Sequence, residues 1–371
     1  MLRLIQRKNL PKKTPKMSDI ITASEKSRLF SLFENMDKEN QFTGLQKSSD
    51  SDILLIDFYN LFIRSFMAIP SMNDNGLHVG GIAGFLKSVG AAIKLLTPSR
   101  VIMVIDGKGG SIKRKKIYPD YKKGRKPSIR FNRSYEDMSS SELEEESLKK
   151  QLFRTVAYLD ALPVTTIAVD NVEADDVIAY LSLEYFKDKN VYITSCDKDF
   201  LQLVNDRVKV WSPSKKKLYG CAEIHSEFGI SCQNFLTYRV LEGDNSDNIS
   251  GIRGAGLKTI IKCFPFLSES KKYTLQEIYN YSDNNKGKLK LYNTILDNKS
   301  IVERNYQLMQ LFDTQIQSFS QLRINEVMQK PINKLNKLQF LKLVGEDKMR
   351  NNLENSGIWL NECFGKLNSY T

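Results

Sequence analysis

The chain has 371 residues, enough for two domains with full hydrophobic cores. Its 55 Lys and Arg against 43 Asp and Glu give a net charge of +12, which favours nucleic acid over a membrane surface as partner. Two histidines, and five cysteines without a C-x-x-C pair, argue against a Cys/His zinc site and fit a reducing cytosol. No apolar run reaches membrane-spanning length, so no membrane partner is expected. Any catalytic metal should therefore be hard and oxygen-ligated.

Residues 1–50 are predicted to form a basic and polar N-terminal extension that is partly disordered. Residues 1–16 contain Lys and Arg but no acid, and they lack the apolar core and cleavage site of a signal peptide. A transit peptide is an alternative, although this stretch has no serine and contains prolines.

Strands alternate with helices between residue 51 and about residue 221. This alternation predicts an α/β domain with a largely parallel sheet and helices on both faces. Beyond about residue 222 the patterns are helical without a clear strand, which predicts a second, helical domain over 222–371. The predicted strands are 52–57, 99–106, 163–170, 190–197 and 208–212, and helical patterns cover 58–66, 80–96, about 142–161 and 173–186.

Acidic residues gather where the predicted strands end and the next elements begin. Because functional residues collect at the carboxyl ends of parallel strands, we expect these acids to lie close together. Crowded carboxylates raise one another's pKa unless cations neutralise them, and Mg²⁺ binds through a few carboxylates. Two such ions about 4 Å apart suit phosphodiester hydrolysis. The set is Asp57, Asp106, Glu173, Asp175, Asp176, Asp197, Asp199, Asp244 and Asp247.

The three acids near residue 175 leave one question open. On an ideal helix Glu173 and Asp176 share a side, whereas Asp175 points elsewhere. Either Glu173 precedes the first full turn, or these acids serve different metal ions.

A glycine-rich stretch follows Asp247 directly. Gly251, Gly254 and Gly256 allow tight turns and close backbone approach, and the N–H groups before a helix starting near residue 257 can hold a phosphate. Arg253 and Lys258 add positive charge to such a contact.

The ordered set of segments resembles the 5′-nuclease superfamily, which includes the 5′-nuclease domain of bacterial DNA polymerase I, the flap endonucleases and the phage 5′–3′ exonucleases once named ribonuclease H. The resemblance covers roughly residues 52–265. It rests on "LLIDFYNLF", "VIMVIDGKG", "VEADDVIAYL", "SCDKDFLQLV" and "LEGDNSDNISGIRGAGLKT".

The resemblance implies a PIN-like fold over 51–221, with a mostly parallel central sheet, a helical arch at about 113–147, and a helix–three-turn–helix at about 235–265 in the C-terminal helical domain. It also implies two Mg²⁺ ions, for which Mn²⁺ can substitute. The first ion would be grouped with Asp57, Asp106, Glu173 and Asp175, and the second with Asp197, Asp199 and Asp247. Asp176 and Asp244 would act at the edge of either.

The predicted arch begins with a strongly basic segment, 113–133, and continues into an acidic one, 134–147. Arg114, Lys122 and Arg125 match the family pattern of an arginine, seven residues to a tyrosine, then K-x-x-R. Cations there would hold the scissile phosphate and offset charge that develops in the transition state. The residues predicted to contact DNA are Tyr121, which would stack on bases, and Gly251, Arg253, Gly254, Gly256, Lys258 and Thr259 in the hairpin.

The activity that the resemblance implies is that of a 5′–3′ exonuclease and structure-specific 5′ flap endonuclease, which cleaves DNA near 5′ ends and removes RNA primers in replication or repair. The expected substrate is DNA with a 5′ flap, nick or RNA primer. We expect a monomer in the cytoplasm of a bacterial or phage-infected cell. K⁺ at the helix–three-turn–helix is a further candidate cofactor. A single-strand-binding protein or a sliding clamp is a further candidate partner.

Two alternatives belong to other classes. A non-catalytic structure-specific DNA-binding protein would gain affinity by losing the acids. A PIN-type ribonuclease would leave the helix–three-turn–helix and the K-x-x-R segment unexplained. For the C-terminal 100 residues, packing on the body is favoured over binding a replication partner.

Overall fold

The computed structural model describes residues 52–124, 141–353 and 355–371. The predicted N-terminal extension, and the part of the predicted arch from 125 to 140, lie outside the described residues. None of the helices in these ranges is long and apolar enough to cross a membrane.

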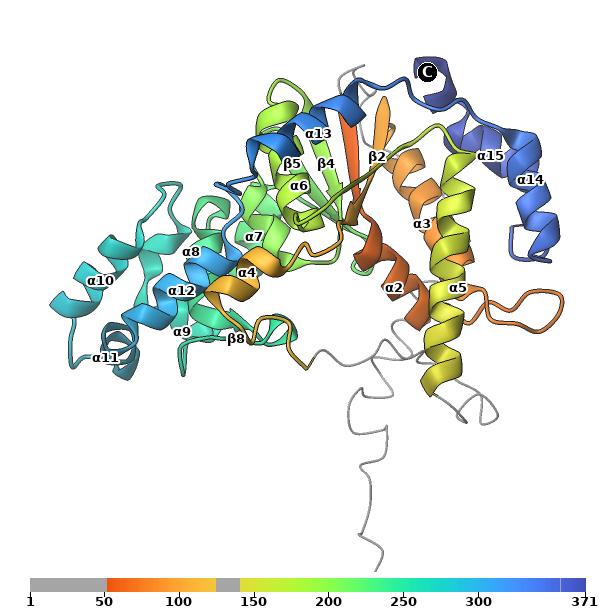
Figure 1. Cartoon of the computed structure of the whole chain (residues 1–371). Helices are drawn as coiled ribbons and strands as arrows, with labels where there is room; N and C mark the ends of the chain where they lie inside the picture. The colour runs from red at the N-terminus through yellow and green to blue at the C-terminus, as the bar shows by residue number, and fades with distance from the viewer. Residues whose placement is uncertain (1–51, 125–140, 354) are drawn as a thin grey trace, which may run out of the picture. The chain divides into compact units, whose positions relative to one another are not determined.

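The nuclease-like part is built on a six-stranded sheet (Figure 1). Strands β1 to β5 run parallel and β6 pairs antiparallel with β5, which confirms the predicted, mostly parallel sheet. The strand order is β3-β2-β1-β4-β5-β6. The strands are β1 (Asp52–Asp57), β2 (Arg100–Asp106), β3 (Thr165–Val169), β4 (Asn190–Thr194), β5 (Val208–Ser212) and β6 (Lys217–Tyr219).

The order of the strands places a topological switch point between β1 and β4. From β1 the chain builds outward through β2 and β3, then returns to add β4 on the other side. In register, Asp57 lies beside Val104, Asp106 beside Val169, and Ile56 beside Thr194. The carboxyl ends of all four strands therefore share one edge, and a crevice at a switch point is where open α/β sheets bind ligands.

Helices cover both faces of the sheet because the strands are apolar on both sides. Leu54 and Ile56 face α2 (Phe58–Ala68), α3 (Gly80–Leu96) and α5 (Ser141–Asp160). Ile53 and Leu55 face α6 (Ala174–Tyr180) and α8 (Phe235–Glu242). Each fully buried aliphatic side chain contributes about 1.5–3 kcal/mol, so both layers fix the strand ends firmly.

The chain after β6 is mainly helical, as predicted, but it contains one short antiparallel pair that the sequence analysis missed. Strands β7 (Gly243–Asp244) and β8 (Ile249–Ser250) are two residues long, too short to show a period. A Cβ on Gly251 would lie 1.8 Å from the carbonyl oxygen of Glu242, so glycine is required for this approach. The helices here, besides α8, are α7 (Cys221–Phe228), α9 (Leu257–Cys263), α10 (Leu275–Asn284), α11 (Lys290–Asp297) and α12 (Lys299–Met309), whereas α4 (Ile112–Ile117) lies earlier, between β2 and α5.

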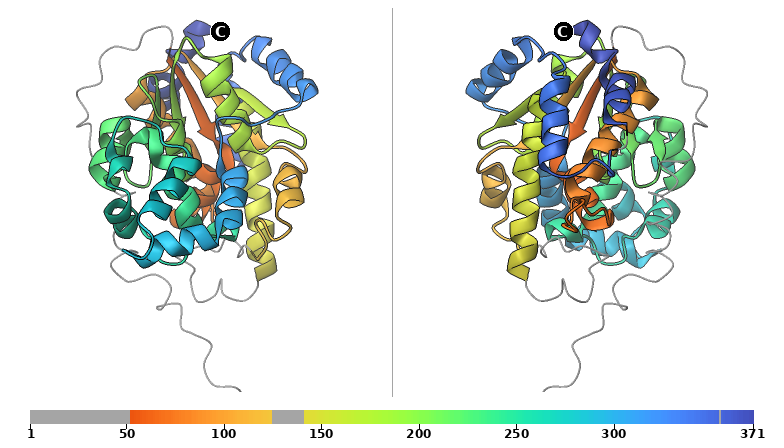
Figure 2. Two further views of the ribbon diagram at one scale, coloured as in Figure 1. Left: turned by 90° about the vertical axis from the view of Figure 1, so that its left-hand side faces the viewer. Right: turned by 90° about the vertical axis from the view of Figure 1, so that its right-hand side faces the viewer.

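The C-terminal helices pack on the body, as favoured from the sequence. Helix α13 (Ser318–Gln329) lies along β3, while α14 (Lys337–Glu346) and α15 (Ser356–Phe364) lie on the side of α3 and α5 (Figure 2). A Cβ on Gly90 of α3 would lie 2.8 Å from the Trp359 ring, which shows how closely α15 approaches. The last three helices thus rejoin the sheet, and the predicted division at residue 222 stays a prediction.

The structure pairs two cysteines that the sequence analysis left unpaired. Cys221 and Cys232 form a disulfide with their Cα atoms 5.2 Å apart. Their separation of 11 residues matches no common motif, so nothing in the sequence analysis suggested this pair. The bridge joins the start of α7 to the turn that precedes α8.

Candidate active site

The predicted acids at the ends of β1 and β4 are linked through one serine. Asp57 caps α2 by accepting from the backbone N–H of Asn60 at 3.2 Å, and its other oxygen accepts from Ser195 Oγ at 2.9 Å. Ser195 Oγ in turn accepts from the backbone N–H of Asp197 at 3.0 Å. Ser195 was not predicted, although it lies next to the strand end in "TSCD". It links the carboxylate of Asp57 to the backbone of Asp197 at the switch point.

Two further acids are held at the starts of helices. Asp197 caps the short 3-10 helix η5 (Lys198–Leu203) by accepting from the backbone N–H of Asp199 at 2.8 Å. Asp106 accepts from the backbone N–H of Ala174 at 2.8 Å, where α6 begins. Capping by an acidic side chain is favourable at a helix N-terminus, so folding itself fixes these carboxylates.

The acids influence one another's ionisation, which shows that they form one cluster. Burial, with repulsion from Asp197 and Asp106, raises the pKa of Asp57 to about 7. Burial and the neighbouring Asp197 raise the pKa of Asp199 to about 7 as well. Burial raises the pKa of Asp175 and of Asp197, with repulsion from other acids added. This region therefore carries negative charge that the protein does not fully compensate.

Part of the cluster is compensated by an arginine that the sequence analysis missed. Arg239 of α8 is buried and donates to Asp199 at 2.9 Å and to Asp244 at 2.7 Å. Hydrogen bonds from Ser246 and the charge of Arg239 outweigh burial and keep the pKa of Asp244 below its ordinary value. A single arginine within the apolar run "NFLTYRVLEG" is the only signal that could have suggested it.

Arg114 compensates a second part of the cluster. It is buried and donates to both carboxylate oxygens of Asp176 at 2.8 Å, and also to Glu173 at 2.5 Å. Its predicted role in holding the scissile phosphate is therefore not matched, because its guanidinium is occupied by these acids. Asp176, predicted to act at the edge of either metal ion, has both of its oxygens bound by Arg114.

The contacts of Arg114 also answer the question about the three acids near residue 175. Glu173 is the N-cap of α6 and shares Arg114 with Asp176, so these two acids lie on one side as an ideal helix predicts. Asp175 points elsewhere and experiences the charges of Lys122, Asp197 and Asp57.

Lys122, predicted to lie at the base of the arch, is next to the acid cluster. Its Nζ donates to Glu173 at 2.8 Å. Although burial opposes the charged form, Glu173, Asp175 and Asp247 raise its pKa, so the ammonium group stays charged. Burial alone would raise the pKa of Glu173. The charges of Arg114 and Lys122 outweigh burial and keep the pKa of that carboxyl below its ordinary value. The third predicted cation, Arg125, lies outside the described residues.

The remaining acids are ligands of the type that binds a hard divalent cation, although their side chains are not yet arranged as a metal site. In the part of the chain that the structure describes, no three Asp, Glu, His or Cys side chains are close enough together to hold a metal ion. The acids that could hold such a cation are Asp57, Asp106, Asp175, Asp197 and Asp247, all carboxylates, which are the ligands that Mg²⁺ prefers. The raised pKa values of Asp57, Asp175 and Asp197 are the feature that a bound cation would reverse.

The predicted DNA-binding hairpin borders a basic cavity. A cavity of about 440 Å³ is lined by residues of α9 and of the start of α11. Its lining contains four cations and no acid: Arg253, Lys258, Lys262 and Lys290. Gly254 and Thr259 line it too, whereas Lys262 and Lys290 were not among the predicted contacts. Such a lining suits the phosphates of a duplex.

Comparison with known proteins agrees with this geometry. Residues 52–229 match the family model described as 5′-3′ exonuclease, N-terminal resolvase-like domain. The chain is 34% identical over 212 residues to a 5′-3′ exonuclease of Aquifex aeolicus, covering 56% of this chain and 67% of that one. It is 34% identical over 210 residues to the flap endonuclease Xni of Shewanella, covering 56% and 72%. The chain belongs to the 5′-nuclease superfamily.

A solved structure extends the likeness in fold beyond the family model. The flap endonuclease of bacteriophage T5, crystallised with DNA and metal ions, matches with a TM-score of 0.57 and 20% identity, covering 75% of this chain and 98% of that one. Against bacterial DNA polymerase I, the aligned part spans 23% of the relative's length. The likeness therefore concerns the 5′-nuclease part of those polymerases.

Two residues predicted to contact DNA have structural tasks in this member of the superfamily. Tyr121 is 3% exposed and its hydroxyl donates to Glu173 at 3.2 Å, so it cannot stack on bases. Gly251 is required for the pairing of β7 with β8 and not for a ligand. Both predictions are therefore corrected, because sequence spacing does not show which way a side chain or a backbone faces.

Gly256 differs from Gly251, because the rest of the chain leaves open space around it. No atom lies within 4 Å of a Cβ built there, and its φ of −75° suits any residue. Gly254 is also unobstructed but has a φ of +89°, which favours glycine. Of the three predicted glycines, Gly256 is thus the one at which the chain itself would accept a side chain, so a substitution there tests the contact with DNA.

We expect the double variant Gly256→Val, Lys258→Ala to fold normally but to bind duplex DNA more weakly. Losing one phosphate contact should lower the slope of log affinity against log salt by about 0.9. Binding titrations over a range of salt concentrations measure this. Gly345→Val with Lys342→Ala on α14 is the matched control, because Gly345 also has open space. An unchanged salt slope would give the hairpin another role.

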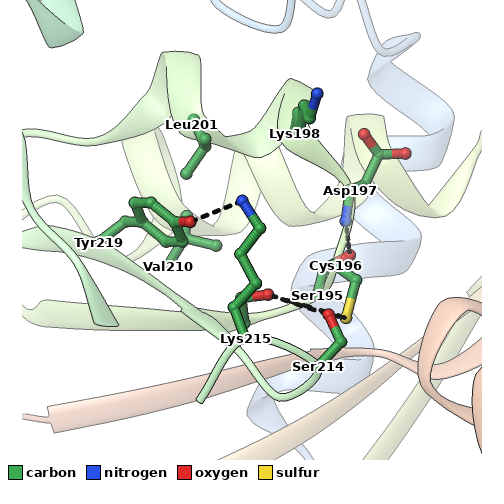
Figure 3. A pocket seen from close by; sticks show the side chains of 10 residues that line it. Ser195, Cys196, Asp197, Lys198, Leu201, Val210, Ser214, Lys215 and Tyr219 are labelled. Atoms are coloured by element: carbon green, nitrogen blue, oxygen red, sulfur yellow. Dashed lines mark hydrogen bonds between the residues drawn. The ribbon is translucent and has the colours of Figure 1, made fainter. Parts of the chain in front are cut away.

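A second, smaller cavity of about 50 Å³ lies beside Asp197, between the loop after β4 and the β5–β6 hairpin (Figure 3). Its cation, Lys215, donates to Tyr219 at 3.0 Å and to Glu227 at 2.6 Å. Cys196 and Ser214 lie 3.2 Å apart on the opposite wall. The cavity is too small for a nucleotide, and its polar groups hold the hairpin against the acid-bearing loop.

Proposed function

We propose that the protein is a divalent-metal-dependent 5′–3′ exonuclease and 5′ flap endonuclease that hydrolyses DNA near 5′ ends. The observation that supports this proposal is the combination of three features. An acid cluster lies at the switch point of the sheet, Lys122 lies beside it, and a cavity lined by cations lies along α9. The relatives named as 5′-3′ exonuclease and flap endonuclease support the activity. The T5 enzyme's complex with DNA and metal ions supports the substrate and the need for metal.

Carboxylates of the acid cluster would hold the metal, which we propose to be two Mg²⁺ ions, with Mn²⁺ as a substitute. These are Asp57, Asp106, Asp175, Asp197 and Asp247, with Asp199 and Glu173 shared with Arg239 and Lys122. When bound, such ions lower the pKa of water and stabilise charge on a phosphoryl oxygen. Ser195 keeps Asp57 and Asp197 in fixed orientation for this task.

Lys122 supplies positive charge where a phosphate would otherwise meet only carboxylates. Its ammonium group is about four-fifths buried and is held by Glu173, so it needs little rearrangement when a substrate arrives. A fixed charge in a partly dry site acts more strongly on developing negative charge than one in water. We assign Lys122 to the scissile phosphate and Lys258 and Arg253 to the duplex.

The biological setting is a proposal of its own. The basic cavity along α9 would hold duplex DNA, and a basic segment lies near the acids. This combination suits removal of RNA primers or 5′ flaps in replication or repair. We propose that the protein does this as a monomer in the cytoplasm. K⁺ at the helix–three-turn–helix, and a sliding clamp or single-strand-binding protein, stay candidates within this proposal.

The decisive experiment compares substrates with and without a 5′ junction. We expect rapid cleavage of a 5′-flapped or nicked duplex near the junction, and very slow cleavage of a covalently closed single-stranded circle. A 3′ flap of equal length should also be cut poorly, because it presents the wrong polarity. Initial rates in Mg²⁺, with chelator as control, measure this.

Each failure of that comparison points to a different conclusion. Comparable rates on the circle and the 5′ flap would mean a general endonuclease. Binding without cleavage of any of these substrates would favour a structure-specific DNA-binding protein, and preference for single-stranded RNA would favour a PIN-type ribonuclease.

A further inference from the structure

The turn that carries Lys122 is attached to the turn that carries Asp247. The backbone N–H of Lys122 donates to the carbonyl oxygen of Asp247 at 2.9 Å. In the opposite direction, Asn248 Nδ2 donates to the carbonyl oxygen of Asp120 at 2.8 Å. We call residues 118–124 the lysine turn and residues 244–248 the acid turn. The two turns are 120 residues apart in sequence, yet they share this reciprocal pair of hydrogen bonds.

Both turns adopt unusual backbone conformations at the contact. Lys122 has a φ of +59° and Asn248 a φ of +60°. The left-handed conformation costs an ordinary L-residue roughly 1–2 kcal/mol, and asparagine tolerates it better than most. The two left-handed residues thus face each other across the contact between the turns.

Helix α12 supports both turns from behind. Asn305 is fully buried and donates to the carbonyl oxygens of Val240 at 3.1 Å and of Ser250 at 2.9 Å, on either side of the acid turn. The guanidinium of Arg304 lies 4.3 Å from the centre of the Tyr118 ring, at the start of the lysine turn. Because one helix holds both turns, the Asn248 contact lies in a rigid frame.

The side chain of Asn248 is the one part of this contact that can be removed without touching the acids or the lysine. Its amide donates to the lysine turn, while the residue ends the short 3-10 helix η7 (Asn245–Asp247). The charge of Asp247, one residue before it, is among those that raise the pKa of Lys122. Asn248 therefore sets where the lysine turn lies relative to the carboxylates.

We infer that Asn248 is a positioning residue for Lys122: by binding the carbonyl oxygen of Asp120, it fixes the ammonium group of Lys122 relative to the acid cluster. This inference rests on the proposed nuclease function. A displacement of about 1 Å in a catalytic group can cost about 10²-fold in rate, so loss of this contact should affect the chemical step. Duplex affinity should be unaffected, because the contact lies away from the basic cavity.

The test is a double-variant cycle in full-length protein. Asn248→Gly keeps the left-handed backbone accessible and removes the amide. We expect it to lower the single-turnover rate on a 5′-flap substrate about 10-fold to 10²-fold, with the dissociation constant for duplex within about twofold. In a Lys122→Ala background the same change should alter the rate less than about twofold. Gln315→Gly, another exposed left-handed amide residue, should leave the wild-type rate unchanged.

Two results would overturn the inference. One is an Asn248→Gly rate equal to wild type, and the other is a multiplicative loss when Asn248→Gly is combined with Lys122→Ala. Melting temperatures show whether each variant is folded. If Asn248→Gly is unfolded, Asn248→Asp keeps the side-chain size but lacks the donor, and the same cycle with it decides the question. A wild-type protein that cleaves no 5′ flap would refute the proposed function, whereas a multiplicative cycle in an active nuclease refutes only the role of Asn248.

Discussion

Replacing Asp197 or Asp106 with asparagine should abolish cleavage while leaving DNA binding unchanged or tighter. Asparagine keeps the size of the side chain and its carbonyl oxygen can still accept from the backbone N–H of Asp199 or of Ala174, so the local fold should survive. What is lost is one negative charge from the cluster that would bind metal. Removing that charge also removes repulsion toward DNA.

The measurement pairs single-turnover rates with binding of Mg²⁺ or Mn²⁺. Each variant should bind metal more weakly than wild type, seen as a smaller rise in melting temperature on adding metal. Asp160→Asn, at the far end of α5, is the control for the loss of one acid. Undiminished cleavage in both variants would refute the assignment of a two-metal site to these carboxylates.

Lys122→Ala should lower the single-turnover rate by about 10²–10³ and change duplex affinity little. The ammonium group lies within the acid cluster, where charge develops during the reaction on this proposal. Glu173 would still be paired with Arg114 at 2.5 Å, so the variant should remain folded. Arg125→Ala, at a position outside the described residues, carries the same expectation.

Lys123 offers a matched control beside Lys122. It is exposed and pairs with Asp120 at 2.8 Å, away from the acids. Lys123→Ala removes the same charge from the adjacent position and should leave the single-turnover rate within a few-fold of wild type. If Lys122→Ala lost affinity alone, Lys122 would belong to general phosphate binding and not to the chemical step.

The location of the acids could be predicted from the sequence because it follows from the strand pattern. Asp57 and Asp106 each end a buried strand, and parallel strands bring their carboxyl ends to one edge. The same reasoning predicted the mostly parallel sheet and the start of α6 at Glu173. These features depend on local periodicity, which a single sequence contains.

The partners of the acids could not be predicted, because they depend on which side chains meet across the fold. Arg239 pairs with Asp199, 40 residues away, and Arg114 pairs with Asp176, 62 residues away. From their spacing in the sequence, Arg114 was predicted to bind a phosphate and Tyr121 to stack on a base. Both side chains are instead buried and bound to acids of the cluster. Likewise, "G-x-x-G-x-G" does not reveal that Gly251 serves β8 whereas Gly256 faces open space.

The packing of the C-terminal helices has a consequence for how the protein is made. Phe340, Leu360 and Phe364 are fully buried, and they belong to the same core as Leu54, Ile56 and Phe85 near the start of the folded chain. During synthesis the early segments emerge first, so the outer side of α3 stays uncovered until α15 has left the ribosome. For that interval the nascent protein presents an apolar surface that chaperones recognise. Completion of this core is therefore a late, post-translational event, even though most of its residues are translated early.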